Sequence, residues 1–446
     1  MGFSYDSCMS THDDLAAGGD RPAPASVPRP RLRRADREQL LPPMSLNDLL
    51  TDDHQARIVW RFVEGLDPTD WYARIRSVEG HPGRPAADPR ILTALWLNAT
   101  LEGVGSARAL DYLCIHHNAF RWLCGGVRVN YHSLSDFRVQ HLEFLDDLLT
   151  HSVAVLREQG LVDLNRVAQD GMRVRASAGA ASFRRRPTLE ECLVEATEQV
   201  QRLRAELEDD PGAGPRRQQQ AQKRAARERE ERLRQALERL PELEAKKKAD
   251  EKAKARCSST DPEATVMKMG DGGFRPAYNF QFATATDSQI IVGVEVTTSG
   301  SDQGQLAPMV EQIHERFGQR PQESLVDGGF ASHADIAAVS TPDQGSVVYA
   351  PVPEPKDPKR DRYTPMEGDS PAVAAWRVRM GTAQAKEIYK ERAASAECVN
   401  ALARNRGLRQ LTVRGRLKAK AIALWYAIAH NLRRAGSLRA ALVAGS

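Results

Sequence analysis

Two aspartates and one glutamate have the residue types that metal-dependent chemistry on phosphate esters needs. Asp170 ends the apolar run Val167-Ala-Gln-Asp170-Gly, Asp327 ends the run Leu325-Val-Asp327-Gly-Gly, and Glu397 follows on a stretch of helical character. Hard Mg²⁺ ions take carboxylate oxygens as ligands, and two such ions about 3.5 to 4 Å apart assist displacement at phosphorus. We therefore expect Asp170, Asp327 and Glu397 to be catalytic residues that bind two Mg²⁺ ions, with Mn²⁺ as a substitute. Small neighbours such as glycine would leave room for metal and phosphate.

Other acidic residues compete for these positions. An aspartate beside a glycine is most often a turn residue. Asp170 and Asp327 are favoured as metal ligands because each follows an apolar run that predicts a strand. On a helix with about 100° per residue, Arg404 lies only about 20° from Glu397, so a carboxylate and a phosphate-binding guanidinium would share a face. The competitors are Asp163, Asp271, Asp302, Glu387 and Glu391.

Basic residues are unevenly distributed along the chain. The net charge of the 446 residues is only +4, but the segment from Ala401 to the C-terminus contains ten Lys or Arg and no Asp or Glu. Such a segment directly after the third carboxylate suits a path for DNA phosphates. A solvated basic tail is the alternative, although Leu424, Trp425 and Ile428 recur at helical spacing and give the segment a face to bury. The residues expected to contact DNA here are Arg404, Arg406, Arg409 and Arg414.

The composition is that of a soluble globular protein. Six cysteines show no paired metal-binding spacing, which favours reduced thiols in a cytoplasmic protein. We find no signal-peptide pattern and no apolar run of membrane-spanning length. The expected location is the cytoplasm.

The chain divides into segments of different character. Residues 1–44 are rich in Pro, Ala and Arg and predict a disordered basic arm. Residues 45–160 show helical periodicity with short turns, which is compatible with a helix-turn-helix DNA reader. Residues 161–446 form the expected catalytic domain, interrupted at 187–256 by a helical hairpin with a heptad seam from Leu189 to Leu207. The phosphate contacts expected in the helical domain are Arg108, Arg121 and Arg138.

The order of elements after residue 160 indicates an α/β fold. A strand over 161–174 precedes the insertion, two antiparallel strands surround Thr286-Asp-Ser-Gln289, and a helix over 303–317 leads to a strand that points at Asp327. A further strand near 346–351 and the helix with Glu397 complete the set. This is the element order of an RNase H-like fold with a mixed sheet, here preceded by an all-α N-terminal domain.

Several strings resemble the DDE transposases of bacterial insertion sequences. Tyr389-x-x-Arg392, then Glu397 and a basic residue seven positions later, is similar to the third motif of that superfamily. The gap between Arg392 and Glu397 is one residue longer than in some branches, and many relatives carry Lys where this chain has Arg404. Further similar strings span about Leu41 to Arg434: Asp88-Pro-Arg-Ile-Leu, Ser106-Ala-Arg108, Ala119-Phe-Arg-Trp-Leu-Cys-Gly-Gly126, Ser133-Leu-Ser-Asp-Phe-Arg138, Ser259-Thr-Asp-Pro262, Met267-Lys-Met-Gly-Asp-Gly-Gly273 and Tyr278-Asn-Phe-Gln281.

The resemblance implies a transposase that binds the terminal inverted repeats of its element, cleaves DNA and joins it to a target. Double-stranded DNA would be its partner, at element ends and target, and the protein would act as a dimer or larger homo-oligomer. The resemblance also implies a bacterial cytoplasm, with the protein in association with the nucleoid. Tyr389 and Arg392 lie on a different helical face from Glu397, so we expect them to reach the flanking DNA strand. Two alternatives stay open: an inactive or domesticated DNA-binding regulator, and a metal-dependent nuclease of the same fold without strand transfer.

Overall fold

The computed structural model describes residues 45–73, 75, 77, 85–209, 216–340, 345–355, 357 and 359–445. The expected basic arm, 1–44, lies outside the described residues. Ser45–Ser446 forms one compact unit.

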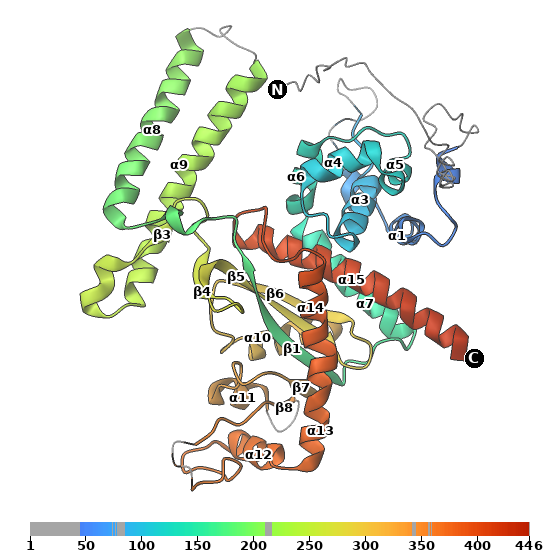
Figure 1. Cartoon of the computed structure of the whole chain (residues 1–446), viewed down its shortest axis with the longest axis vertical. Helices are drawn as coiled ribbons and strands as arrows, with labels where there is room; N and C mark the ends of the chain where they lie inside the picture. Colours follow the sequence, from blue (N-terminus) through green and yellow to red (C-terminus); the bar gives the residue numbers. More distant parts are fainter. Residues whose placement is uncertain are drawn as a thin grey trace, which may run out of the picture. The chain divides into compact units, whose positions relative to one another are not determined.

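Helices make up the first part of the described chain (Figure 1). Asp88 caps the most buried of them, α3, because its Oδ1 accepts a hydrogen bond from the Arg90 amide at 2.8 Å. A short 3₁₀ turn, Leu46–Leu49, comes first. The α-helices that follow are α1 Gln55–Glu64, α2 Thr69–Ala73, α3 Pro89–Leu101, α4 Ala107–His116, α5 Asn118–Cys124, α6 Tyr131–Gln140 and α7 Leu142–Glu158.

A six-stranded mixed sheet lies at the centre of the following part. The long strand β1 pairs antiparallel with β5 on one side and parallel with β7 on the other, while β5 also pairs antiparallel with β6 and β4, and β7 pairs parallel with β8. The fold is thus mixed α/β with a helical N-terminal region, as the sequence predicts. The strands are β1 Arg166–Arg175, β4 Thr265–Lys268, β5 Phe274–Ala285, β6 Ile291–Thr297, β7 Glu323–Leu325 and β8 Val347–Tyr349.

The first strand differs from its predicted bounds. It begins at Arg166 instead of residue 161, because Asp163 forms a turn in which its Oδ1 accepts from the Asn165 amide at 2.8 Å. The pairing with β5 continues to Arg175. Asp170 therefore lies in the middle of β1 and not at its end, which corrects the expectation from the apolar run.

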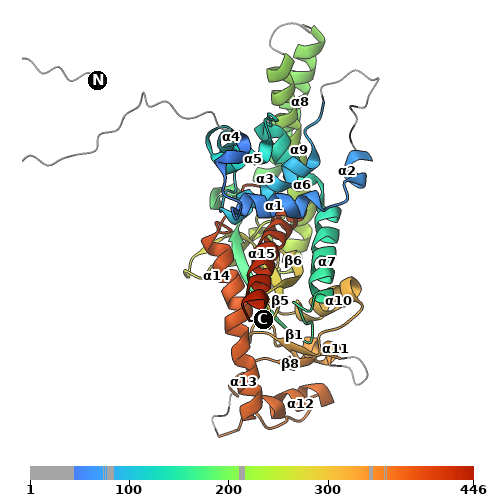
Figure 2. The same ribbon diagram turned by 90° about the vertical axis from the view of Figure 1, so that its right-hand side faces the viewer.

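Helices cover both faces of this sheet (Figures 1 and 2). Gln169 of β1 faces α10, since its Nε2 donates to the Gln305 carbonyl just before that helix. Phe282, opposite Asp170 in β5, faces the C-terminal helix α15 and packs against Tyr426, with tilted rings whose centres are 5.6 Å apart. The remaining helices are α10 Leu306–Phe317, α11 His333–Val339, α12 Pro371–Met380, α13 Ala383–Arg392, α14 Cys398–Asn405 and α15 Arg416–Gly445, with a π-helical turn, Ala393–Glu397, between α13 and α14.

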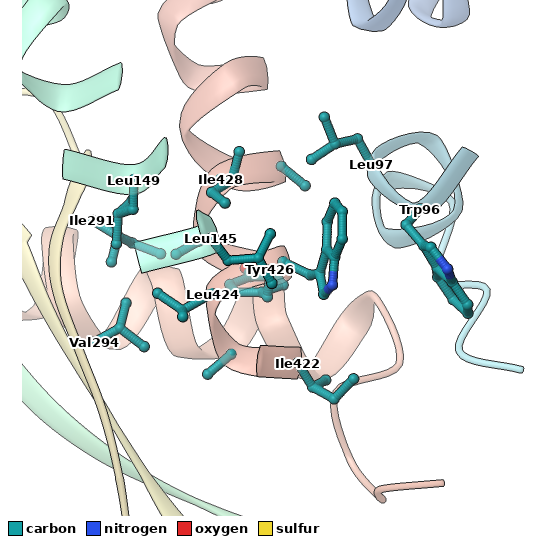
Figure 3. Close-up of a cluster of buried hydrophobic side chains, with 14 of the residues drawn as sticks. Trp96, Leu97, Leu145, Leu149, Ile291, Val294, Ile422, Leu424, Tyr426 and Ile428 are labelled. Carbon is teal, nitrogen blue, oxygen red and sulfur yellow. The ribbon is translucent and has the colours of Figure 1, made fainter. Parts of the chain in front are cut away.

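The C-terminal helix α15 is part of the main hydrophobic core and not a solvated tail. Trp425 and Ile428 are buried against α3, α7 and β6, so residues of the N-terminal helices and of the sheet share one core (Figure 3). The apolar face predicted for this segment is therefore present, although Leu417 on the same helix is exposed. Lys420 forms an ion pair with Glu295 of β6 at 2.8 Å, so part of the basic charge is already neutralised.

A helical hairpin follows β1, in the region where the sequence predicts one. It consists of α8 Arg186–Asp209 and α9 Arg216–Ala245, which pack along each other, followed by a 3₁₀ turn Ala249–Lys254 (Figure 1). At its base, β2 Phe183–Arg184 pairs antiparallel with β3 Cys257–Ser258. Arg186 and Glu244 add an ion pair of 3.0 Å across the two helices. The hairpin has its own small core of apolar side chains around Leu189, Leu233 and Leu240.

Candidate active site

The register of two parallel strands brings the two aspartates together. Ala168 of β1 pairs with Leu325 of β7. Asp170 and Asp327 each come two residues after this pair, and side chains two residues apart in extended chain lie on the same face. The two aspartates therefore occupy equivalent positions on neighbouring segments, and both lie on the face of the Ala168–Leu325 pair.

A single guanidinium joins all three carboxylates. Arg392, the last residue of α13, donates through Nη2 to Asp170 Oδ1 at 2.9 Å and through Nη1 to Glu397 Oε1 at 2.5 Å. Asp327 Oδ2 lies 3.8 Å from Nη2. The side chain of Arg392 is only 9 % exposed, whereas that of Glu397 is 53 % exposed. The structure thus brings Asp170, Asp327 and Glu397 to one place, at the end of α13.

The π-helical turn explains why Arg392 is found there. In an α-helix, five residues correspond to about 140° of rotation, which would turn Arg392 away from Glu397. A π-helical turn has hydrogen bonds between residues five apart, so residue 397 comes over residue 392. The expectation that Arg392 lies on another helical face from Glu397 is therefore corrected by the structure, and contact of Arg392 with DNA stays a prediction. Tyr389, one turn earlier, is half-buried, and burial raises the pKa of its hydroxyl.

Burial and hydrogen bonds act in opposite directions on the first aspartate. Burial raises the pKa of Asp170 above its ordinary value, while the charge of Arg392 and a hydrogen bond from Asn400 oppose the rise. Asn400 Nδ2 donates to Asp170 Oδ2 at 2.9 Å, and the Gly171 amide donates to Oδ1 at 3.0 Å. Burial alone would lower the pKa of Arg392, but the surrounding charges, with Asp170 first, make the net direction upward.

Asn400 is a site residue that the sequence reasoning missed. It is buried on α14, three residues after Glu397, and therefore on the same side of that helix. This spacing was the available signal, because a polar side chain three residues from a candidate ligand and on its face can reach a shared partner.

Gly171 leaves room for another side chain, Asp302, and not for the metal and phosphate expected from the sequence. A Cβ atom at this position would lie 2.2 Å from Asp302 Oδ1, so the missing side chain makes room for Asp302 on the opposite face of β1. Asp302 is buried there and accepts hydrogen bonds from Asn279, Gln281 and Arg173 at 2.7, 2.7 and 2.9 Å. Asp302 thus connects β1 and β5 on the sheet face opposite to Asp170, and it does not join the three carboxylates.

The other competing acids have different partners. Glu391 forms an ion pair with Arg166 at 2.5 Å, and Glu387 pairs with Lys390 at 2.6 Å on an exposed surface. Asp271 pairs with Arg275 at 2.7 Å in the β4–β5 turn.

The arginines expected to contact DNA have unequal surroundings. Arg138 is buried, donates to the Gly105 carbonyl at 2.6 Å and stacks over Trp96, and burial lowers the pKa of its guanidinium to about 10. As it stands Arg138 supports the core, which corrects its assignment as a surface phosphate contact. Arg406 is half-buried beside Tyr426, and burial lowers its pKa. The exposed members of the set are Arg108, Arg121, Arg404, Arg409 and Arg414.

The turn between β5 and β6 links the site to α15. Gln289 has a positive φ of 58°, and its Nε2 donates to the Ala394 carbonyl in the π-helical turn at 2.7 Å. His430 of α15 contacts the Gln289 carbonyl through Nε2 at 2.9 Å. Asn431 forms two hydrogen bonds of 2.8 Å with the backbone of Ile291. The C-terminal helix therefore positions the β5–β6 turn, and this turn in its place holds the π-helical turn that carries Glu397.

Comparison with protein families identifies two segments of the chain. Residues 44–140 match the family described as Transposase domain (DUF772), and residues 356–435 match the family described as Transposase DDE domain. The second match contains Arg392, Glu397 and Asn400, whereas Asp170 and Asp327 lie outside both. Neither the curated proteins nor the solved structures contain a match to the chain. Among the helices that the structure describes, none has the length and apolarity to cross a membrane.

Proposed function

Because the chain belongs to the DDE transposases of insertion sequences, we propose that it binds the terminal inverted repeats of its element and catalyses metal-dependent DNA cleavage and strand transfer. The observation that carries the proposal is the convergence of Asp170, Asp327 and Glu397 on Arg392. The strand order β6-β5-β1-β7-β8, with β7 and β8 parallel to β1, supports an RNase H-like catalytic domain. Its substrate would be double-stranded DNA, and it would act as a dimer or larger assembly.

The donor set fits the expected metal, but the present arrangement holds a guanidinium instead. Three carboxylates supply only oxygen ligands, which suits Mg²⁺ or Mn²⁺. In the described part of the chain, no three His, Cys, Asp or Glu side chains are spaced to hold a metal ion. Arg392 accounts for this spacing, because its guanidinium lies among the carboxylates and offsets part of their charge. We infer that Arg392 moves aside when Asp170, Asp327 and Glu397 take up metal.

Each residue then has a defined part in the reaction. When bound, two Mg²⁺ ions would stabilise the entering and leaving oxygens of an in-line displacement at phosphorus. Asn400 and the Gly171 amide orient the Asp170 carboxylate. Arg392, if released from the carboxylates, would remain beside the site and could donate two parallel hydrogen bonds to a phosphate group there. Water would be the nucleophile in cleavage, and the freed 3′ hydroxyl would be the nucleophile in strand transfer.

The test separates chemistry from DNA binding. Asp170→Asn, Asp327→Asn and Glu397→Gln keep the side-chain shape but remove the charge that holds Mg²⁺, so each is expected to abolish end cleavage and leave end binding nearly intact. Asp271→Asn, on the exposed β4–β5 turn, is the matched control and should cleave normally. Full cleavage by any of the three variants would remove that residue from the site. Wild-type protein that cleaves ends but never joins them would be a nuclease, and one that binds without cleaving would be a regulator.

A further inference from the structure

A hollow at the base of the helical hairpin has a strongly basic lining. Arg229 and Arg232 come from α9, and Arg414 comes from the loop that leads from α14 to α15. Ser259 and Thr260, just after β3, add polar groups. The hollow has a volume of about 240 Å³, and we call it the root pocket. Three segments that are far apart in the sequence thus present cationic and polar side chains to one space.

The charge of the root pocket is only partly neutralised, although the buried Asp261 opposes the lowering of the pKa of Arg232. Glu195 lies 3.5 Å from Arg229 Nη2, and Glu228 lies 3.8 Å from Arg232 Nη1, but both acids are more than half exposed. Exposed ion pairs of this kind contribute little. Burial lowers the pKa of Arg232, and the positive charge of Arg414 lowers it further. The Nε of Arg232 is buried without a hydrogen-bond partner among the described residues. An anion in the pocket would relieve the repulsion among these guanidinium groups.

The lining selects a phosphate group. Guanidinium groups present paired donors that match phosphate oxygens, and hydroxyl side chains donate to the same atoms. The volume is below the range typical for drug-sized ligands, so the pocket suits a small anionic group. Arg414 lies on the segment that follows the α14 helix of the active site. We propose that the root pocket binds one backbone phosphate of DNA and so attaches the helical hairpin to the duplex. This rests on the proposed function for the identity of the partner.

The experiment measures DNA binding by the full-length protein across a salt series, without divalent metal. Arg232→Gln and Arg229→Gln each weaken the hold on the single phosphate, so the slope of log affinity against log salt should fall in each variant, by at most about one unit. Arg234→Gln is the matched control, because Arg234 lies on the same helix, pairs with Glu230 at 2.6 Å and does not line the pocket. Arg229 is nearly half exposed, which keeps its variant informative if Arg232→Gln does not fold. Equal slopes in all four proteins would overturn the proposal.

A second measurement distinguishes DNA phosphate from free phosphate. Inorganic phosphate is titrated into the wild-type protein and into Arg232→Gln, and the melting temperature is followed. Stabilisation of the wild-type protein alone, together with a reduced salt slope for the variant, supports the proposal. Stabilisation by phosphate with an unchanged salt slope would assign the pocket to a free anion and overturn it. Because neither measurement requires cleavage, failure of the transposase chemistry leaves the result interpretable.

Discussion

Among single residues, Arg392 has the largest effect on the charge of the carboxylate cluster. Its guanidinium contacts Asp170 and Glu397 directly and lies 3.8 Å from Asp327, so one positive charge is shared among three carboxylates and offsets part of their repulsion. Removing one partner from a buried ion pair leaves an unpaired charge, which typically costs about 3 to 5 kcal/mol. Arg392 therefore stabilises the cluster of carboxylates and, under the proposed function, would compete with the metal ions for them.

This competition predicts a measurable change in metal response. Arg392→Gln should lower the melting temperature of the metal-free protein, because Asp170 loses its buried partner. Millimolar Mg²⁺ should then raise the melting temperature more in the variant than in the wild-type protein, since no guanidinium has to be displaced. Arg166→Gln is the control, because Arg166 pairs with Glu323 and Glu391 and with none of the three site carboxylates. An identical Mg²⁺ response in wild type and Arg392→Gln would show that the guanidinium does not compete.

At the scale of elements, the π-helical turn sets the phase between two helices. Ile388 and Tyr389 of α13 pack on the apolar cluster around Trp376, whereas Val399 and Ala403 of α14 are buried in the main core. One residue fewer would rotate one helix by about 100° relative to the other. The longer gap between Arg392 and Glu397 is thus accommodated by a local change in helix type.

Deleting Ala394 tests this phase relationship. The deletion should restore α-helical spacing and force either α13 or α14 out of its packing. A loss of stability on the order of 2 to 5 kcal/mol is expected, comparable to losing a large core side chain, together with loss of cleavage. Ala394 is exposed, so Ala394→Ser, which keeps the chain length, should change stability by less than about 0.5 kcal/mol. Denaturant unfolding of both variants makes the comparison, and wild-type stability in the deletion variant would contradict the account.

The sequence predicted which helices and strands are present better than it predicted the geometry where one element meets the next. Alternation of apolar residues gives β5 and β6 because one sheet face is buried, and the run before each aspartate leads to the parallel register that joins Asp170 and Asp327. A helical pattern with a period of 3.6 residues contains no sign of a single π-helical turn, so the burial of Arg392 could not be foreseen. The contact between Gly171 and Asp302 joins residues 131 positions apart and depends on tertiary packing alone.

At the scale of the whole molecule, α15 joins the parts of the fold. It packs on α3 and α7 of the helical region and on β6 of the sheet (Figure 3). His430 lies on this helix with its ring buried, and burial lowers the pKa of His430 to about 4. Its protonation is therefore linked to unfolding of the whole unit.

The linkage gives a pH dependence of known sign. The unfolded chain binds the proton near pH 6.5, whereas the folded protein resists it down to about pH 4. The contribution of His430 is therefore complete above pH 6.5 and is lost as the pH falls toward 4, with a total on the order of 3 kcal/mol. His430→Gln, which keeps a donor toward the Gln289 carbonyl, should flatten this part of the stability profile in urea unfolding. An unchanged difference between pH 7 and pH 5 would exclude His430 as the source.

The central position of α15 also decides what happens to damaged copies of the gene. A chain that stops at residue 415 lacks Ala421, Leu424, Trp425 and Ile428, so neither the helices nor the sheet can close their core. Such a chain is expected to show no cooperative melting, and a folded, DNA-binding truncation product would refute this. Under the proposed function, a copy with a substituted carboxylate would, in contrast, keep its fold and still occupy element ends. A late frameshift would then abolish the protein altogether, whereas a missense change at one of the three carboxylates would turn it into a competitor of its intact siblings.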